Sequence, residues 1–387
     1  MPTSENSTPS TGSSTRTVSN PFAVERKAGT GLLDFSRALD GDDADMMECD
    51  DETPKLLNES PSNFPSLLKR RQPILAAYSH LVTPYPRFLM ADYFERLRER
   101  NGRPPSPDET SPTEEYPDYF ETQFRIVNPL GRGSFANVVK VQSKTNGMLY
   151  AVKKTRTPFT GYKDGMHRLK EVDILWKVGT SPHCVSLVCA WVQYGYLYLQ
   201  MELCANGSLF TYLEEQCRTS RVDEPRIWRI LAEVTSGLKH IHDLDIAHLD
   251  LKPENILISE DGSLKIGDFG LASNTPVPRG EDREGDRTYI APELFRDAAY
   301  GKPADIYSLG LIILEIAGNI VLPENGPLWQ KLREGDISDT NLSDVSPPLI
   351  DLIKSMLAPN PAARPTAENI LSHPLLQTMG GSGAAGG

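Results

Sequence analysis

The sequence of 387 residues lacks several features that mark whole classes of protein. Its five cysteines form no Cys-x-x-Cys pair and no paired His/Cys ligand spacing, so neither a disulfide framework nor a zinc site is predicted. We expect reduced thiols of the cytosol or nucleus. The first residues contain no apolar run, so no secretory signal is expected.

Long hydrophobic runs and an excess of positive charge are also lacking. The most apolar segment, residues 308–322, is too short to span a bilayer and contains Glu315 and Asn319, so it predicts a buried helix. The chain has 52 acidic against 40 basic residues and a net charge of −12. This balance argues against non-specific binding to nucleic acid and against a basic membrane-binding face.

The chain divides by composition into three parts. Residues 1–118 are rich in Ser, Thr, Pro and acidic residues, which predicts a mostly disordered segment. It holds six Ser-Pro or Thr-Pro sites, at Thr8, Thr53, Ser60, Thr83, Ser106 and Ser111. Upstream proline-directed kinases could use them as switches, although Ser and Pro also co-occur simply in disordered chains. Residues 124–376 alternate hydrophobic segments with turns, as a folded domain does, and residues 377–387 predict a flexible tail.

The folded part begins with two weak phosphate-binding signals. Gly131 and Gly133 lie between two β-like runs, where a glycine hairpin lets backbone N–H groups approach phosphates, although such a hairpin can also be only a turn. Further on, Lys153 shares a strand face with Ala151 and is predicted to point under the hairpin. A solvated lysine at a sheet edge is the alternative.

A helix is predicted next, within residues 162–179, from hydrophobic residues at helical spacing. Within it, Glu171 is the best candidate to pair with Lys153. Spacing alone fits a solvent-facing acid equally well.

The strongest signal is HLDLKPENILI, residues 248–258, followed by Asp268-Phe269-Gly270. Phosphoryl transfer needs an acid that accepts the proton of the attacking hydroxyl, and oxygen ligands for Mg²⁺ near the phosphates. Asp250 suits the first role, and Asn255 and Asp268 suit the second. This ordered set, with a glycine loop and a lysine upstream, is typical of protein kinases.

Over residues 124–376 the sequence therefore resembles the eukaryotic protein kinases. The resemblance implies an α+β, bilobal fold with a small β-rich lobe, a larger helical lobe, and ATP with Mg²⁺ between them. It implies catalytic roles for Asp250, Lys153 and Lys252. The residues implied around the nucleotide are Leu130, Gly131, Gly133, Val138, Ala151, Lys153, Glu171, Met201, Glu202 and Cys204. Met201 is also compatible with a simple core position.

The same resemblance implies two structural contacts. Glu293 and Arg364 match a buried ion pair, and Asp305 matches the residue that braces the catalytic loop. A pseudokinase that only binds is the alternative to an enzyme, and an ATP-turnover assay separates the two.

Three departures from the common pattern narrow the family. Leu249 replaces the arginine before the catalytic aspartate, Glu-Gly-Asp stands at residues 284–286, and LPENGPLWQKLREG stands at residues 322–335. Together they resemble the Wee family of mitotic inhibitor kinases, in a fungal form. The resemblance implies phosphorylation of the inhibitory tyrosine of a mitotic cyclin-dependent kinase–cyclin complex, which delays mitosis. Relatives of the membrane-tethered Myt type carry an apolar anchor after the kinase domain, whereas residues 377–387 are mostly Gly and Ala, so a nuclear, also cytoplasmic, Wee-type enzyme is expected. An ordinary Ser/Thr kinase is the alternative.

Two predictions concern regulation and specificity. Leucine at position 249 cannot hold a phosphate, so activity is expected without activation-loop phosphorylation. An ionised Asp286 can only accept hydrogen bonds through its side chain, so it is predicted to pair with Lys252 and to repel Asp250. Whether this pair selects tyrosine or only stabilises the loop is left open.

Overall fold

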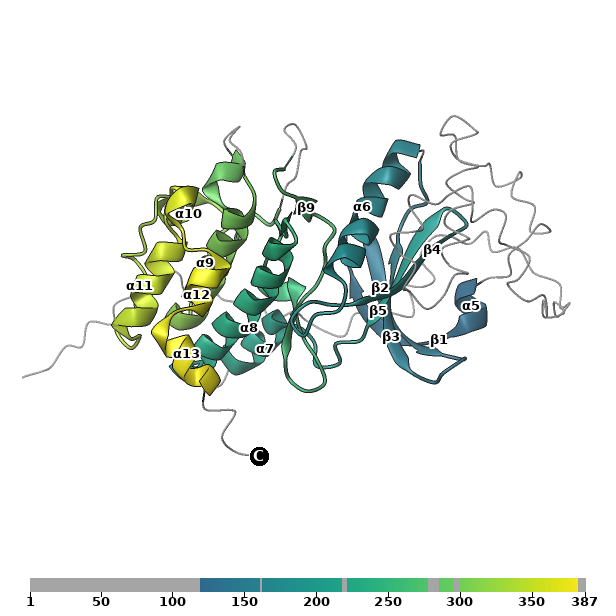
Figure 1. The fold of residues 1–387 in the computed structure, drawn as a ribbon, viewed down its shortest axis with the longest axis horizontal. Helices are drawn as coiled ribbons and strands as arrows, with labels where there is room; N and C mark the ends of the chain where they lie inside the picture. Colours follow the sequence, from purple (N-terminus) through teal and green to yellow (C-terminus); the bar gives the residue numbers. More distant parts are fainter. Residues whose placement is uncertain (1–118, 161, 218–220, 278–284, 296–299, 382–387) are drawn as a thin grey trace, which may run out of the picture.

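The computed structural model describes residues 119–160, 162–217, 221–277, 285–295 and 300–381. They form a small lobe built on a β-sheet and a larger helical lobe, which follow one another along the chain (Figure 1). The predicted α+β, bilobal architecture is therefore confirmed. The predicted disorder of residues 1–118, with its Ser-Pro and Thr-Pro sites, lies outside the described residues.

The small lobe is an antiparallel sheet of five strands in the order β1-β2-β3-β5-β4. The strands are β1 (Phe124–Arg132), β2 (Ala136–Ser143), β3 (Leu149–Thr155), β4 (Leu187–Gln193) and β5 (Tyr196–Glu202). The short helix α5 (Tyr119–Gln123) precedes the sheet, and α6 (Tyr162–Val178) packs beside it, as the helical spacing predicted (Figure 1).

The two faces of this sheet are used differently because successive side chains of a strand point to opposite sides. On one face, Trp191 and Tyr198 stack with ring centroids 5.0 Å apart, and Tyr119 of α5 meets Trp191 edge-on at 5.0 Å. Lys154 lies on this aromatic face, with its Nζ 4.6 Å from the Tyr196 ring centroid. Lys153, the next residue along β3, therefore points to the opposite face, as predicted.

The large lobe is assembled around one buried helix. Its helices are α7 (Leu209–Cys217), α8 (Glu224–Asp243), α9 (Lys302–Gly318), α10 (Gly326–Arg333), α11 (Pro347–Met356), α12 (Ala367–Leu371) and α13 (Pro374–Gly381), with 3₁₀ turns η2 (Pro253–Asn255), η3 (Pro292–Phe295) and η4 (Pro361–Ala363). Every residue of α9 from Ala304 onward is buried. Burial on every side is typical of a central helix. The buried helix predicted over residues 308–322 is confirmed up to Gly318, where α9 ends.

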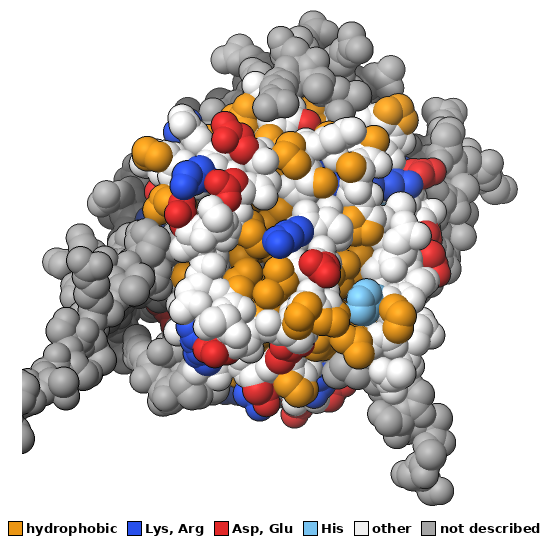
Figure 2. Space-filling view, turned by 90° about the vertical axis from the view of Figure 1, so that its left-hand side faces the viewer, with side chains coloured by type: hydrophobic (Ala, Val, Ile, Leu, Met, Phe, Trp, Pro, Cys, Tyr) orange, Lys and Arg blue, Asp and Glu red, His pale blue; other side chains and the backbone are white. Residues whose placement is uncertain are grey.

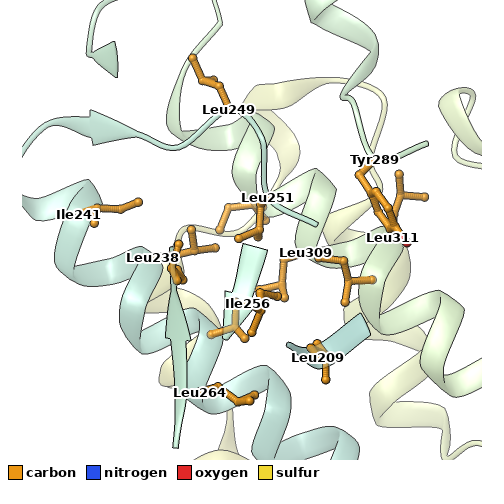
Figure 3. Packing of buried hydrophobic residues seen from close by; sticks show 14 of the residues in the cluster. Leu209, Leu238, Ile241, Leu249, Leu251, Ile256, Leu264, Tyr289, Leu309 and Leu311 are labelled. Carbon is orange, nitrogen blue, oxygen red and sulfur yellow. The ribbon is translucent and has the colours of Figure 1, made fainter. Parts of the chain in front are cut away.

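Leucines and isoleucines from several segments fill the core around α9. Figure 3 shows Leu309 of α9 among Leu251 and Ile256, which belong to the motif of residues 248–258, and Leu238 of α8. Apolar packing against α8 and α9 therefore fixes the catalytic loop. In the part of the chain that the structure describes, no helix has the length and hydropathy needed to cross a bilayer.

Two small ladders bring the motif loops together. Strand β6 (Ile246–Ala247) pairs with β9 (Ser273–Asn274), and β7 (Ile256–Ile258) pairs with β8 (Leu264–Ile266). Two segments therefore connect one ladder to the other: the segment from β6 to β7 and the segment from β8 to β9. These are the segments that carry Asp250, Asn255 and Asp268.

The end of the folded part differs from the prediction. A flexible tail was expected from residue 377, but α13 continues to Gly381. Gln377 explains the difference, because its backbone N–H donates to His373 O at 3.1 Å and its side-chain amide donates to Leu371 O at 2.9 Å. Residues 382–387 lie outside the described residues.

Figure 2 shows the molecule from the end of the large lobe that lies at the left of Figure 1. Hydrophobic side chains gather near the middle of this face, and acidic and basic side chains alternate around them. The described part of this face therefore carries no continuous basic stripe.

Candidate active site

A lysine held between two carboxylates forms one half of the site. Lys153 Nζ lies 2.7 Å from Glu171 Oε1 and 2.9 Å from Asp268 Oδ1. Burial disfavours the charge of Lys153, but the two carboxylates outweigh it and hold the pKa of the ammonium above its usual range. Lys153 is therefore a fixed cation, and the question left open by spacing is answered in favour of the Glu171 pair.

Asp268 is the second carboxylate of this group and has an unusual backbone. Its φ is 55°, in the left-handed region that non-glycine residues rarely adopt. The Lys153 ammonium lowers the pKa of Asp268 to about 2, so its carboxylate is ionised at neutral pH. Its side chain is half exposed, at 51%. A strained, charged and accessible carboxylate of this kind is common at functional sites.

The catalytic loop forms the other half of the site around Asp250. Asn255 Nδ2 donates to Asp250 O at 2.8 Å and to Asp250 Oδ2 at 3.0 Å, and Lys252 Nζ lies 3.2 Å from the same Oδ2. Burial works against the charge of Lys252, but Asp250 and Asp286 outweigh it and raise its pKa. Asp250 is thus oriented by an amide and a cation, as a group that accepts a proton must be.

Asp305 holds this loop in place from α9. Its fully buried carboxylate accepts hydrogen bonds from His248 N at 2.9 Å, Leu249 N at 2.8 Å and His242 Nε2 at 2.9 Å. Leu249 has a φ of 65°, so this backbone needs such support. The bracing role implied by the family resemblance is confirmed.

One face of the sheet is left for a nucleotide. Val138 is the cross-strand partner of Lys153, and Ala151 is the partner of Met201. Directly opposed residues of an antiparallel pair share a face, so these four side chains lie on one side of the sheet. Leu130 and Gly131 lie near the end of β1, where Gly131 is the cross-strand partner of Val138, and a Cβ on Gly131 would meet no atom within 4 Å. The hairpin thus has the open space that a phosphate group needs.

The hinge between the lobes contributes Glu202 and Cys204. The carboxylate of Glu202 accepts from Ser186 N at 2.7 Å and from Lys265 Nζ at 3.1 Å, so it fixes the hinge. Burial raises the pKa of the Cys204 thiol to about 12. The Glu202 carboxylate is thus occupied by protein donors and the Cys204 thiol is uncharged at neutral pH, so neither side chain offers a free charge to a nucleotide.

The residues present fit ATP and Mg²⁺, which a protein kinase domain implies. Asn255 uses its amide N–H groups on Asp250, which leaves its amide oxygen as a ligand beside the accessible carboxylate of Asp268. Among the described residues, no group of three or more His, Cys, Asp or Glu could hold a metal ion alone. Mg²⁺ is usually held by one or two protein oxygens together with substrate phosphates, and Asn255 and Asp268 would supply such oxygens.

The segment before Ala291-Pro292-Glu293 closes the site. Asp286 Oδ2 lies 3.6 Å from Lys252 Nζ, so the predicted pair is confirmed. Sequence reasoning missed a second contact, in which the Asp286 backbone N–H donates to Asp250 Oδ1 at 3.1 Å. Gly285 permits this approach, because a Cβ there would meet Leu249 O at 2.8 Å.

A buried ion pair anchors the end of this segment. Arg364 Nη1 and Nη2 donate to Glu293 Oε1 and Oε2 at 2.7 and 2.8 Å. Both side chains are buried, and the two parallel bonds are the strong bidentate form. The pair implied by the family resemblance is confirmed.

Two residues of α10 also contact the segment and were given no role from sequence. Trp329 Nε1 and Arg333 Nη2 both donate to Arg287 O, at 2.9 and 2.8 Å. Their i, i+4 spacing was the available signal, but their acceptors are backbone carbonyls that no motif reveals.

Comparison with known proteins agrees with this geometry. Residues 124–376 match the protein kinase domain family. The mitosis inhibitor protein kinase wee1 of Schizosaccharomyces pombe is 47% identical over 273 residues, which cover 65% of this chain and 31% of wee1. The membrane-associated tyrosine- and threonine-specific cdc2-inhibitory kinase of Drosophila melanogaster is 43% identical over 263 residues, covering 67% of this chain and 48% of the relative.

A probable protein kinase of Dictyostelium discoideum is 40% identical over 263 residues, which cover 67% of this chain and 74% of that relative. The chain spans less than half the length of the wee1 and cdc2-inhibitory relatives that it matches. The site geometry, the family match and these identities lead to one assignment: the chain belongs to the protein kinases and, within them, to the Wee family.

Proposed function

We propose that this chain transfers the γ-phosphate of ATP to the inhibitory tyrosine of a mitotic cyclin-dependent kinase and thereby restrains entry into mitosis. Two groups of contacts carry the phosphotransfer: Lys153 with Glu171 and Asp268, and Asn255 with Asp250. The names of the relatives support the substrate, since one is a mitosis inhibitor and another is cdc2-inhibitory.

Each residue has a defined task in this proposal. ATP supplies the phosphoryl group, and Mg²⁺ would be held by Asn255 and Asp268. Lys153, fixed by Glu171, binds the phosphates and keeps them in one orientation. Asp250 accepts the proton of the attacking hydroxyl, and Lys252 stabilises negative charge near the same point.

Asp286 supports a preference for tyrosine. A threonine side chain at this position could donate to the catalytic aspartate, whereas the ionised carboxylate of Asp286 only accepts. Its Oδ2 lies 3.6 Å from Lys252 Nζ and partly neutralises that ammonium. The hydrogen bond to Asp250 is made instead by the backbone N–H of Asp286. We propose that the resulting loop position favours the longer reach of a tyrosine hydroxyl. Stabilisation of the loop alone, with docking selecting the tyrosine, is the competing explanation.

A second candidate function is phosphorylation of serine or threonine as well. Lys252 lies 3.2 Å from Asp250 Oδ2, in the arrangement of the Ser/Thr-type loop Asp-Leu-Lys-Pro-Glu-Asn. The cdc2-inhibitory relative is also named as both tyrosine- and threonine-specific. The two candidates differ in the residue that receives the phosphate.

Phosphosite mapping tests the proposal. The full chain is incubated with ATP, Mg²⁺ and an intact cyclin-dependent kinase–cyclin complex, and modified residues are located by mass spectrometry. We expect phosphate on the tyrosine of the substrate's glycine loop, and none with the Asp250→Asn variant. Phosphate on serine or threonine alone would favour the ordinary Ser/Thr kinase, and no ATP turnover at all would favour a pseudokinase.

Two wider aspects of the function rest on the resemblance. We propose that proline-directed kinases phosphorylate the Ser-Pro and Thr-Pro sites of residues 1–118, which phosphoproteomics of the full-length protein would test. We also propose a nuclear site of action, which imaging of a fluorescent full-length fusion would test.

A further inference from the structure

The last turn of α10 carries an aromatic–cation pair outside the ATP site. Trp329 and Arg333 are four residues apart and lie on one face of the helix. The guanidinium carbon of Arg333 lies 4.0 Å from the Trp329 ring centroid, within the range of a cation–π contact. The ring therefore supports the guanidinium in one position.

Arg333 is buried, with 6% of its surface exposed, yet no carboxylate among the described residues forms an ion pair with it. Its Nη2 instead donates to Arg287 O at 2.8 Å, Thr288 O at 3.0 Å and Ile290 O at 3.1 Å. Burial lowers its pKa to about 10, so it remains charged at neutral pH. Burying a charge without a counter-charge is costly, so these hydrogen bonds must offset the cost.

The acceptors of Arg333 belong to the segment that touches the catalytic aspartate. Tyr289 N and Ile290 N donate back to Asp286 O at 3.1 and 3.0 Å, which closes a turn over residues 286–290. The N–H of Asp286 at the start of this turn donates to Asp250 Oδ1. By binding carbonyls of this turn, Arg333 therefore also fixes the position of the Asp286 N–H that contacts Asp250.

Helix α9 supports the same turn from the other side. Ser308 Oγ donates to Tyr289 O at 2.8 Å, and Tyr289 OH donates to Glu315 Oε2 at 2.6 Å. By contrast, Leu249, which replaces the arginine of the common motif, is packed in the core with 6% exposed. It can contribute apolar contacts to the loop but no hydrogen bond to a phosphate.

We propose that Arg333, supported by Trp329, is a positioning residue that holds the activation segment in its catalytic shape through neutral backbone acceptors, in place of an activating phosphate. Arg333 acts on Asp250 only through the turn of residues 286–290. The inference rests on kinase activity and is independent of which hydroxyl or which protein is phosphorylated.

Three substitutions in the full chain test this role. Arg333→Met removes the donors and keeps an unbranched apolar chain, and Arg333→Lys restores a cation with donors on a stem of similar length. Lys331→Met is the matched control, because Lys331 is on the same helix and instead pairs with Asp339 at 2.6 Å. For each variant, kcat and KM for ATP are measured from ADP release, so the result does not depend on the protein substrate.

The shape of the turn is measured separately, by hydrogen exchange of residues 285–290 and by tryptic cleavage after the exposed Arg287. We expect Arg333→Met to lower kcat at least ten-fold, with KM for ATP within two-fold, and to speed exchange and cleavage of this segment at least ten-fold. Arg333→Lys is expected to recover part of both, and Lys331→Met to match the wild type. A merely structural loss would speed exchange across the whole large lobe.

Wild-type kcat and wild-type protection of residues 285–290 in Arg333→Met would overturn the proposal. If that variant does not fold, Trp329→Leu decides the matter, because it removes both the ring that supports the guanidinium and the N–H that donates to Arg287 O. A lower kcat with faster cleavage after Arg287 supports the proposal, and wild-type values of both overturn it.

Discussion

Replacing Asp305 with asparagine tests the brace under the catalytic loop. The carboxylate accepts three hydrogen bonds, from His248 N, Leu249 N and His242 Nε2. An asparagine has one oxygen, so its amide N–H₂ must face at least one of these donors. The least disruptive placement keeps the bonds of Oδ2 and leaves Leu249 N–H buried without an acceptor.

The cost can be worked from these contacts. A buried N–H without a partner costs about 1–3 kcal/mol, and the two remaining bonds lose their charge assistance at about 1 kcal/mol each. The free energy of unfolding should therefore fall by about 3–5 kcal/mol. Leu249 should also lose the hydrogen bond that holds it in its left-handed conformation, which costs about 1–2 kcal/mol. Asp250, the next residue, is then no longer fixed.

The assay combines urea unfolding with steady-state ATP turnover at a temperature where the variant is folded. We expect kcat to fall at least ten-fold while KM for ATP stays within two-fold, since the nucleotide face lies on the other lobe. Asp336→Asn, the same chemical change at an exposed loop carboxylate that accepts from Ser338 N, is the control and should change neither. An Asp305→Asn variant with wild-type stability and kcat would contradict the bracing role of Asp305.

Three further predictions concern the site. Lys153→Arg and Asp268→Asn should each reduce phosphotransfer at least a hundred-fold, because each removes a positioning contact. The melting temperature should fall by no more than a few degrees, since core packing is kept. Near-normal turnover in either variant would contradict the assigned roles. Asp286→Thr should raise the ratio of serine and threonine to tyrosine phosphorylation of an intact cyclin-dependent kinase, and an unchanged ratio would remove Asp286 from the specificity argument. The pKa of Cys204 is raised to about 12 by burial, so its alkylation by iodoacetamide should become about ten-fold faster per pH unit from pH 7 to 10. Peptide mass spectrometry follows the reaction, and a rate that levels off below pH 9.5 would show an ordinary thiol.

Much of the site could be predicted from sequence because its chemistry depends on side-chain type at fixed spacing. Asp250, Asn255 and Asp268 stand in short, ordered motifs, and the structure places them together between two small ladders. Glu171 was ambiguous, since spacing alone fits a solvent-facing acid equally well, and only the packing of α6 beside the sheet resolves it.

Contacts made by the backbone could not be predicted in the same way. The N–H of Asp286 on Asp250, and the carbonyls of Arg287, Thr288 and Ile290 on Arg333, involve groups that every residue has. Arg333 lies 43 to 46 residues further along the chain, so no local pattern joins it to the turn. The extension of α13 was missed for a related reason, because its glycines outweighed the capping contacts of Gln377.

The most direct test of the account is tyrosine phosphorylation by a protein that carries no phosphate. The full chain is treated exhaustively with a phosphatase, the phosphatase is removed, and the initial rate of phosphotyrosine formation on an intact cyclin-dependent kinase–cyclin complex is measured against untreated protein. The account predicts equal initial rates within two-fold, with phosphate on tyrosine, because Arg333 and Asp305 hold the site without a phosphate. A large loss that is restored only after phosphorylation at Ser273, Thr275 or Thr288, or phosphate on serine and threonine alone, would contradict it.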